Sequence, residues 1–140
     1  MRRALILLTL ASASACAPSV TEGFQRAKAA GDRALSAGRY DEAARAYRDA
    51  ADAADRQRDR DEALFLEAGV FRRARDLEKA KAAYRALLAE SPLGERAARA
   101  SYELAWLEIE TGNEAEGYAL LERALREHPE AGPARRALKR

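Results

Sequence analysis

Residues with reactive or metal-binding side chains are scarce in this sequence. Its 140 residues include one cysteine, Cys16, and one histidine, His128. A lone cysteine cannot close an internal disulfide, and a single histidine leaves a zinc-type site without enough ligands. The sequence also holds no nucleophile–base set and no glycine-rich loop that would cradle a phosphate. We therefore expect no enzymatic activity, no metal and no cofactor.

Proline, glycine and aromatic residues are also few. There are 4 prolines and 8 glycines, 6% of the residues are aromatic, and 34% are charged. The prolines and glycines fall at intervals, which is typical of breaks between helices. An alanine-rich, highly charged chain favours amphipathic helices with small residues at their contacts over a β-sheet core. The predicted fold class is all-α, and the length allows one modest domain.

A surplus of positive charge is almost absent. The formal net charge is +2, and Arg2 and Arg3 account for it, because without them 23 of the 25 basic residues remain against 23 acidic ones. Phosphate backbones bind to surfaces with a clear excess of lysine and arginine. The neutral remainder therefore argues against a nucleic acid as the main partner.

The first 15 residues have the three parts of a secretory signal peptide. Arg2 and Arg3 give a positive start, residues 4–11 form an apolar run, and Ser12 to Ala15 are small. The apolar run is far shorter than the ~20 residues of a membrane-spanning helix. We therefore predict that residues 1–15 are a cleaved signal peptide, and we leave them out of the fold.

The segment Ala13-Ser14-Ala15-Cys16 resembles the lipobox of bacterial lipoproteins, in which the cysteine is acylated and becomes the new N-terminus. The resemblance implies a lipidated Cys16 and a tether over residues 16–22. Because Ala17 follows where aspartate would retain the protein at the inner membrane, it implies the periplasmic face of the outer membrane. Ala13 stands where the family usually has leucine, and the segment also suits the ordinary signal peptidase. A soluble periplasmic protein is the alternative.

The rest of the chain repeats itself at an interval of 37 residues. Three stretches, which begin at residues 38, 75 and 112, align at this spacing. Tyr47 and Tyr84 are 37 residues apart, as are Pro92 and Pro129, and Gly38 and Gly112 are separated by two periods. A fixed period of this size indicates a repeat architecture in which each unit buries its apolar face on the next.

These features resemble the tetratricopeptide repeat (TPR) family, whose helix hairpins repeat about every 34 residues. The resemblance implies an α-solenoid of about three hairpins over residues 23–131, with repeats at about 24–57, 61–94 and 98–131. Helices that cross closely need small residues at the crossing. The sequence offers Gly31, Ala43, Ala68, Ala80, Ala105 and Gly117 at these positions. Residues 132–140 are then a short basic tail.

The same pattern predicts helices over residues 22–37, 40–57, 60–74, 77–90, 95–111 and 114–127. The 37-residue period of this chain is three residues longer than that of the family. We expect the three extra residues to lie between repeats, at 58–60 and 95–97. The alternating charges of residues 55–61 indicate a solvated turn. Asn113, with Glu116 three residues later, predicts an N-cap for the last helix.

In TPR arrays the concave face comes from the first helix of each hairpin. By this resemblance the inner face consists of Gln25, Lys28, Asp32, Leu35, Ser36, Glu62, Phe65, Gly69, Arg72, Arg73, Arg99, Tyr102, Trp106, Ile109 and Glu110. Aromatic and arginine side chains are the usual anchors of interfaces. The predicted partner-binding groove is therefore lined by Lys28, Phe65, Arg72, Arg73, Arg99, Tyr102, Trp106 and Ile109. The alternative is that Tyr102 and Trp106 pack between helices.

The last two repeats also resemble outer-membrane TPR lipoproteins, such as the β-barrel assembly lipoproteins and the Tol-Pal coordinator family. The residues that carry this resemblance are Glu90 to Ala97 and Tyr102 to Ala105. It implies a protein-binding scaffold in a cell-envelope complex that serves barrel assembly, secretin or pilus piloting, motility, or cell-wall coordination. The alternatives are a soluble periplasmic adaptor and a regulator of a cell-wall enzyme.

Overall fold

The computed structural model describes residues 20–129. The predicted signal peptide (residues 1–15), the lipidation site Cys16, most of the tether and the basic tail (residues 132–140) lie outside the described residues. The last two tether residues, Thr21 and Glu22, form the cap and the first position of a helix. The Thr21 hydroxyl donates a 2.7 Å hydrogen bond to the carbonyl of Ala53, which anchors this end of the chain to the fold.

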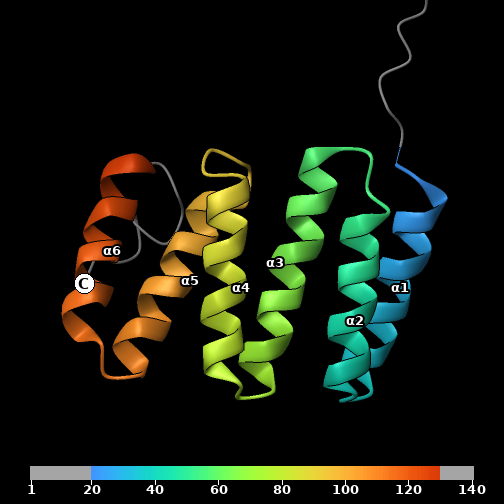
Figure 1. Cartoon of the computed structure of the whole chain (residues 1–140), viewed down its shortest axis with the longest axis horizontal. Helices are drawn as coiled ribbons and strands as arrows, with labels where there is room; N and C mark the ends of the chain where they lie inside the picture. The colour runs from blue at the N-terminus through green and yellow to red at the C-terminus, as the bar shows by residue number, and fades with distance from the viewer. Residues whose placement is uncertain (1–19, 130–140) are drawn as a thin grey trace, which may run out of the picture.

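Six helices account for most of the described residues. They are α1 (Glu22–Ser36), α2 (Tyr40–Asp52), α3 (Gln57–Arg73), α4 (Leu77–Glu90), α5 (Ala97–Glu110) and α6 (Glu114–Glu127). They stand in one row from α1 to α6, and each packs mainly against its neighbours in sequence (Figure 1). The predicted all-α solenoid is confirmed.

The predicted helix ends agree with the structure except around the first connection between hairpins. α2 ends at Asp52 rather than residue 57, and α3 begins at Gln57 rather than residue 60. Residues 58–60, expected between repeats, therefore form the first turn of α3. The prediction was wrong there because no proline follows α2, whereas Pro92 and Pro129 come directly after the caps of α4 and α6.

The turn inside each hairpin is built in the same way three times. Gly38, Arg75 and Gly112, spaced 37 residues apart, all have a positive φ, of 71°, 64° and 90°. In each turn the following residue donates a backbone hydrogen bond to a carbonyl five positions earlier, as in Asp76 to Phe71. This arrangement ends a helix with a left-handed residue, which glycine adopts without strain. The middle turn achieves it with arginine.

Small residues lie where the two helices of a hairpin cross, as predicted. A β-carbon added at Gly31 in α1 would lie 2.7 Å from the ring of Tyr47 in α2, and one at Gly117 in α6 would lie 2.8 Å from the carbonyl oxygen of Ala105 in α5. Both distances are shorter than a van der Waals contact, so any larger residue would separate the helices.

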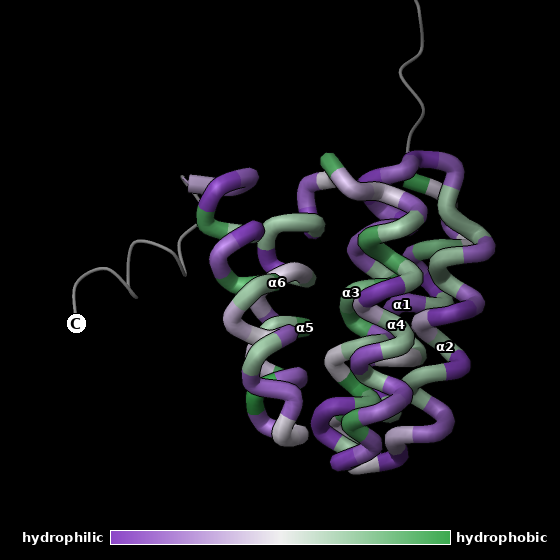
Figure 2. Tube along the Cα trace, turned by 60° about the vertical axis from the view of Figure 1, so that its left-hand side comes forward, coloured by the Kyte–Doolittle hydropathy of each residue, from purple (hydrophilic) through white to green (hydrophobic). Residues whose placement is uncertain are grey.

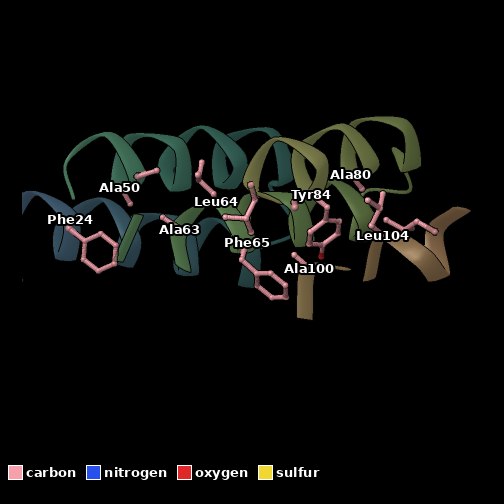
Figure 3. Close-up of a cluster of buried hydrophobic side chains, with 13 residues drawn as sticks. Phe24, Ala50, Ala63, Leu64, Phe65, Ala80, Tyr84, Ala100 and Leu104 are labelled. Carbon is pink, nitrogen blue, oxygen red and sulfur yellow. The ribbon is translucent and has the colours of Figure 1, made fainter. Parts of the chain in front are cut away.

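The main hydrophobic core runs without interruption from α1 to α5. Hydrophobic and hydrophilic residues alternate along the helices, so that each has an apolar side for its neighbours (Figure 2). The buried members of this cluster are Phe24, Ala50, Ala51, Ala63, Leu64, Phe65, Ala68, Ala80, Tyr84, Leu87, Ala100, Leu104 and Leu107 (Figure 3). Because many of them are alanines, no single hairpin has a large core, and each repeat depends on the next.

A buried ionic cluster joins α4, α5 and the start of α6. The carboxylate of Glu108, which is 0% exposed, accepts hydrogen bonds from Arg85 and from the Asn113 amide at 2.8 Å. The Lys81 ammonium, also buried, lies 3.5 Å from the same carboxylate. The predicted capping role of the Asn113 side chain is therefore wrong. Asn113 occupies the N-cap position of α6, but its side chain turns back to Glu108.

A second buried carboxylate corrects the prediction of a solvated turn at residues 55–61. Asp61 is 1% exposed and accepts hydrogen bonds of 2.8 Å from the Ser91 hydroxyl and from the Gln57 amide. These bonds tie the start of α3 to the turn after α4. The alternating charges failed as a guide because residues 57–61 belong to α3, and Asp61 lies on the side of this helix that faces Ser91 after α4.

Replacing Gly117 by alanine should lower the free energy of unfolding by about 1–3 kcal/mol, because the new methyl group collides with the α5 backbone. Gly69→Ala is the matched control. Gly69 lies inside α3 and nothing is within 4 Å of an added β-carbon. Alanine there should stabilise the helix by up to about 1 kcal/mol. Melting curves recorded by circular dichroism measure the stability of both variants. Equal shifts would mean that α5 and α6 do not cross at Gly117.

Glu108 should make the stability of the fold sensitive to acid. Burial alone would raise its pKa, but the Asn113 hydrogen bond and the charges of Arg85 and Lys81 outweigh burial and lower the pKa. A lowered pKa stabilises the fold fully above the ordinary value of about 4.3 and ceases to do so as the pH falls through the folded-state pKa. The free energy of unfolding, measured with urea, should therefore be lower at about pH 3 than at pH 7.

The Glu108→Gln variant should lose this part of the pH dependence and be less stable by about 1–3 kcal/mol at pH 7, because Arg85 and Lys81 each lose a carboxylate partner. The loss stays moderate because Lys81 keeps its 2.8 Å pair with Glu78. Glu122→Gln, on the exposed side of α6, is the matched control and should behave like the unchanged protein. An identical acid profile in Glu108→Gln and the unchanged protein would contradict the role given to this cluster.

Candidate functional site

A cleft of about 370 Å³ lies where α1, α3, α4 and α5 meet. Its lining residues are Leu35, Phe65, Leu66, Gly69, Arg72, Arg73, Tyr84, Arg99 and Glu103. Five of the nine come from α3, at spacings of one, three or four residues, which places them on one side of that helix. α3 therefore forms the centre of the cleft, and α1 and α5 form its two sides.

Two aromatic rings form the inner wall of the cleft. The rings of Phe65 from α3 and Tyr84 from α4 are neighbours, with their centroids 5.6 Å apart and their planes at 58° (Figure 3). Phe65 is 8% exposed. Burial and the nearby carboxylate of Glu103 raise the pKa of Tyr84, so its hydroxyl stays neutral. This wall is rigid and largely apolar.

Arginines surround this aromatic wall. The guanidinium of Arg99 lies 5.2 Å from the centre of the Phe65 ring, and that of Arg96, just before α5, lies 5.6 Å from it. Cations over an aromatic face are attracted to its electron density. Arg72 and Arg73, from the last turn of α3, complete the basic lining. Three arginines against one glutamate leave the lining with a surplus of positive charge.

Glu103 is the acidic residue of the cleft. Its carboxylate pairs with Arg72 across the gap between α3 and α5, and it lies 3.9 Å from Arg99 one helical turn earlier. A second pair lies outside the cleft, where Arg75, in the turn after α3, is 2.9 Å from Glu110 of α5. A third joins Arg96 to Glu62. These pairs hold α3 and α5 at a fixed distance along the cleft.

Four of the eight residues predicted for the groove line this cleft together. They are Phe65, Arg72, Arg73 and Arg99. Lys28 is not among the lining residues, because its ammonium pairs with Asp32 at 3.0 Å, and Asp32 also accepts a 2.7 Å hydrogen bond from the Tyr47 hydroxyl. Partial burial alone would raise the pKa of Asp32, but these two hydrogen bonds lower it. Lys28 is therefore engaged within its own hairpin.

Tyr102 and Ile109 lie between α5 and α6 and not in the cleft. Tyr102 is 3% exposed and packs against Ala124, with Leu121 and Leu125 beside it. Within residues 20–129 its buried hydroxyl has no hydrogen-bond partner, and burial raises its pKa. A side-chain carbon of Ile109 would lie 2.5 Å from a β-carbon at Gly117, so Ile109 fills the helix crossing.

Trp106 lies beside the cleft without lining it. It is 56% exposed on α5, three residues after Glu103 and four before Glu110. Residues three or four apart share one side of a helix, so Trp106 continues the side that carries Arg99 and Glu103. An exposed tryptophan next to a basic cleft extends the apolar surface available to a partner.

Sequence reasoning missed Leu66, Tyr84 and Glu103 as lining residues. In the sequence Tyr84 served only to mark the 37-residue repeat, whereas in the structure it belongs to the main core and also lines the cleft. Glu103 follows Arg99 by four residues, a spacing at which opposite charges meet on a helix. That spacing was the available signal. The contact with Arg72, 31 residues away, has no counterpart in local sequence.

A second cleft, of about 410 Å³, lies between α2 and α3 and differs in charge. Its lining residues are Asp41, Ala44, Arg45, Arg48, Asp49, Glu67 and Phe71. The charges nearly balance, Arg48 pairs with Glu67 at 2.7 Å, and the Lys79 ammonium lies over the Phe71 ring at 5.8 Å. Arg48 and Glu67 are thus engaged with each other, and the lining has no surplus of positive charge. The α3–α5 cleft keeps the greater capacity for a charged ligand.

The described part of the chain adds two further observations. Within residues 20–129, no group of histidine, cysteine or acidic side chains is arranged to hold a metal ion. Among the six helices, none combines the length and the apolar character that crossing a bilayer requires.

The paired helices, the small residues at their crossings and the repeated turns have a counterpart among known families. The tetratricopeptide repeat family model matches residues 28–95 and again residues 67–135, which together exceed half of the chain. The chain belongs to the tetratricopeptide repeat family. TPR arrays generally mediate protein–protein interactions, so this array is a protein-interaction module. No curated protein matches the sequence.

Proposed function

We propose that this TPR array is a scaffold that binds an acidic, extended segment of a partner protein in the cleft between α3 and α5. The observation that carries the proposal is the combination of Arg72, Arg73 and Arg99 with the aromatic wall of Phe65 and Tyr84. Arginine forms paired hydrogen bonds with carboxylates through its planar fork of donors, which makes it suited to recognising acidic side chains.

The shape of the site supports an extended ligand. The cleft is bounded by helices on opposite sides, and the exposed Trp106 lies beyond its α5 edge. Aromatic and arginine residues supply most of the binding energy at interfaces when they are held rigidly. Here α3 and α5 are positioned by the continuous hydrophobic core, so a partner meets a site that is already formed. Little rearrangement is needed, which favours binding.

The cellular setting is proposed from the N-terminal sequence. A signal peptide followed by Cys16 supports a lipoprotein anchored by acyl chains at the periplasmic face of the outer membrane, where the array would serve a cell-envelope complex. One acyl chain holds a protein only marginally, and several chains anchor it firmly. Barrel assembly, secretin or pilus piloting, motility and cell-wall coordination are candidate settings. The alternative is a soluble periplasmic adaptor or a regulator of a cell-wall enzyme.

Reversing the charge of Arg73 should weaken binding to an acidic peptide. The exposed Arg73 lines the cleft and makes no ion pair within residues 20–129. The probe is a fluorescein-labelled peptide of alternating glutamate and phenylalanine, and fluorescence anisotropy with the full chain measures its Kd. Arg73→Glu should lose about 1–2 kcal/mol of binding, or about 5- to 30-fold in Kd.

Arg123→Glu is the matched control, because it makes the same charge change on the exposed side of α6 away from the cleft. It should leave the Kd within about twofold, since a distant exposed charge is screened by salt. Equal losses in both variants would show that only net charge matters, and the cleft would then not be the binding site. Circular dichroism confirms that both variants are folded.

Lipidation is tested separately at Cys16. In a bacterial host, labelled palmitate should enter the unchanged protein, and Cys16→Ala should abolish the label and release the protein into the periplasmic extract. Ser14→Ala, which leaves the cysteine in place, is the control and should remain labelled. An unlabelled, soluble wild-type protein would reject the lipoprotein and favour the soluble periplasmic adaptor.

A further inference from the structure

The cleft already contains a carboxylate where a ligand's carboxylate would bind. Glu103 pairs with Arg72 of α3 and lies 3.9 Å from Arg99 of α5. Its side chain is only 22% exposed, whereas those of Arg72 and Arg99 are 51% and 60% exposed. The arginines thus keep donors available to solvent, while the acid between them is shielded by the cleft.

Glu110 provides a comparison on the same helix. It pairs with Arg75 at 2.9 Å, and both side chains are well exposed, at 43% and 74%. Neither lines the cleft. Both glutamates therefore pair with an arginine from the neighbouring hairpin, Glu103 with Arg72 of α3 and Glu110 with Arg75 of the turn after α3. Only Glu103 places its negative charge inside the proposed binding site.

We propose that Glu103 is a specificity-determining residue that makes the cleft reject ligands with one isolated negative charge and select those with adjacent negative charges. This inference rests on the proposed function of the cleft. A single ligand carboxylate at Arg72 and Arg99 either replaces the existing pair or lies beside a like charge, so its net gain is small. Adjacent carboxylates also reach Arg73, which Glu103 leaves unengaged.

The physical basis is a difference between two affinities. Repulsion from Glu103 acts on every acidic ligand, but a ligand with several adjacent acids recovers the loss through charge-assisted hydrogen bonds to additional arginines. The aromatic wall contributes equally to both kinds of ligand, because Phe65 and Tyr84 are 8% and 1% exposed and do not meet the ligand's charged groups. Discrimination therefore depends on Glu103, while affinity depends on the arginines and on the rings of Phe65 and Tyr84.

Two fluorescein-labelled ten-residue peptides test the proposal. They share one phenylalanine and differ in carrying either one glutamate or three adjacent glutamates. Fluorescence anisotropy with the full chain at fixed ionic strength gives each Kd. The unchanged protein should bind the triglutamate peptide at least ~10-fold more tightly. Glu103→Gln keeps the shape of the side chain and removes its charge. It should strengthen binding of the single-glutamate peptide more than binding of the triglutamate peptide, so that the preference for the triglutamate peptide falls to about threefold or less.

Two further variants separate charge in the cleft from general effects. Glu110→Gln removes the matched carboxylate outside the cleft and should leave the preference unchanged. Glu103→Asp keeps the negative charge and should retain most of the preference. Melting curves recorded with each variant establish that the protein is folded at the temperature of the binding assay.

The outcomes distinguish the two proposals. If the unchanged protein binds both peptides and Glu103→Gln alters neither Kd, or strengthens both equally, the role of Glu103 is overturned and the cleft remains the binding site. If neither the unchanged protein nor Glu103→Gln binds either peptide better than a matched lysine peptide, the proposed function of the cleft fails, and the role of Glu103 fails with it.

Discussion

The close crossing of paired helices at small residues is the contact on which the rest of the structure depends. At Gly31 and Gly117 a single added carbon would collide with the partner helix. Because the crossings are so close, each hairpin is thin and buries mostly alanine, and its stability comes from stacking on the next hairpin. The continuous core from α1 to α5 is the direct result.

Stacking in turn builds the cleft. It places α3 and α5 next to each other on one face, so that Arg72 and Glu103, 31 residues apart, meet across the gap. The ionic contacts along this gap are exposed or partly exposed, and each contributes little to stability by itself. Their main effect is geometric, because they hold the arginines in fixed positions around the Phe65 ring.

Buried and exposed charges therefore have different roles in this array. Glu108 and Asp61 are enclosed and supplied with hydrogen-bond donors, which fixes α4 to α5 and the start of α3 to the turn after α4. Such groups are costly to bury and costly to disrupt. The cleft keeps its charge near solvent, where a partner can reach it. The proposed binding capacity depends on this separation, with a rigid interior and a charged face that is only partly engaged.

Local sequence determined the helices, their breaks and the small residues at the crossings, because helical periodicity, glycine and proline act over a few residues. The resemblance to the TPR family also identified Phe65, Arg72, Arg73 and Arg99 of the cleft. Tertiary packing decided the rest. Tyr102 and Trp106 are one turn apart on α5, yet α6 covers the first and leaves the second exposed. The pairing of Arg72 with Glu103 likewise exists only when hairpins stack, since no local pattern specifies which distant residue will face another.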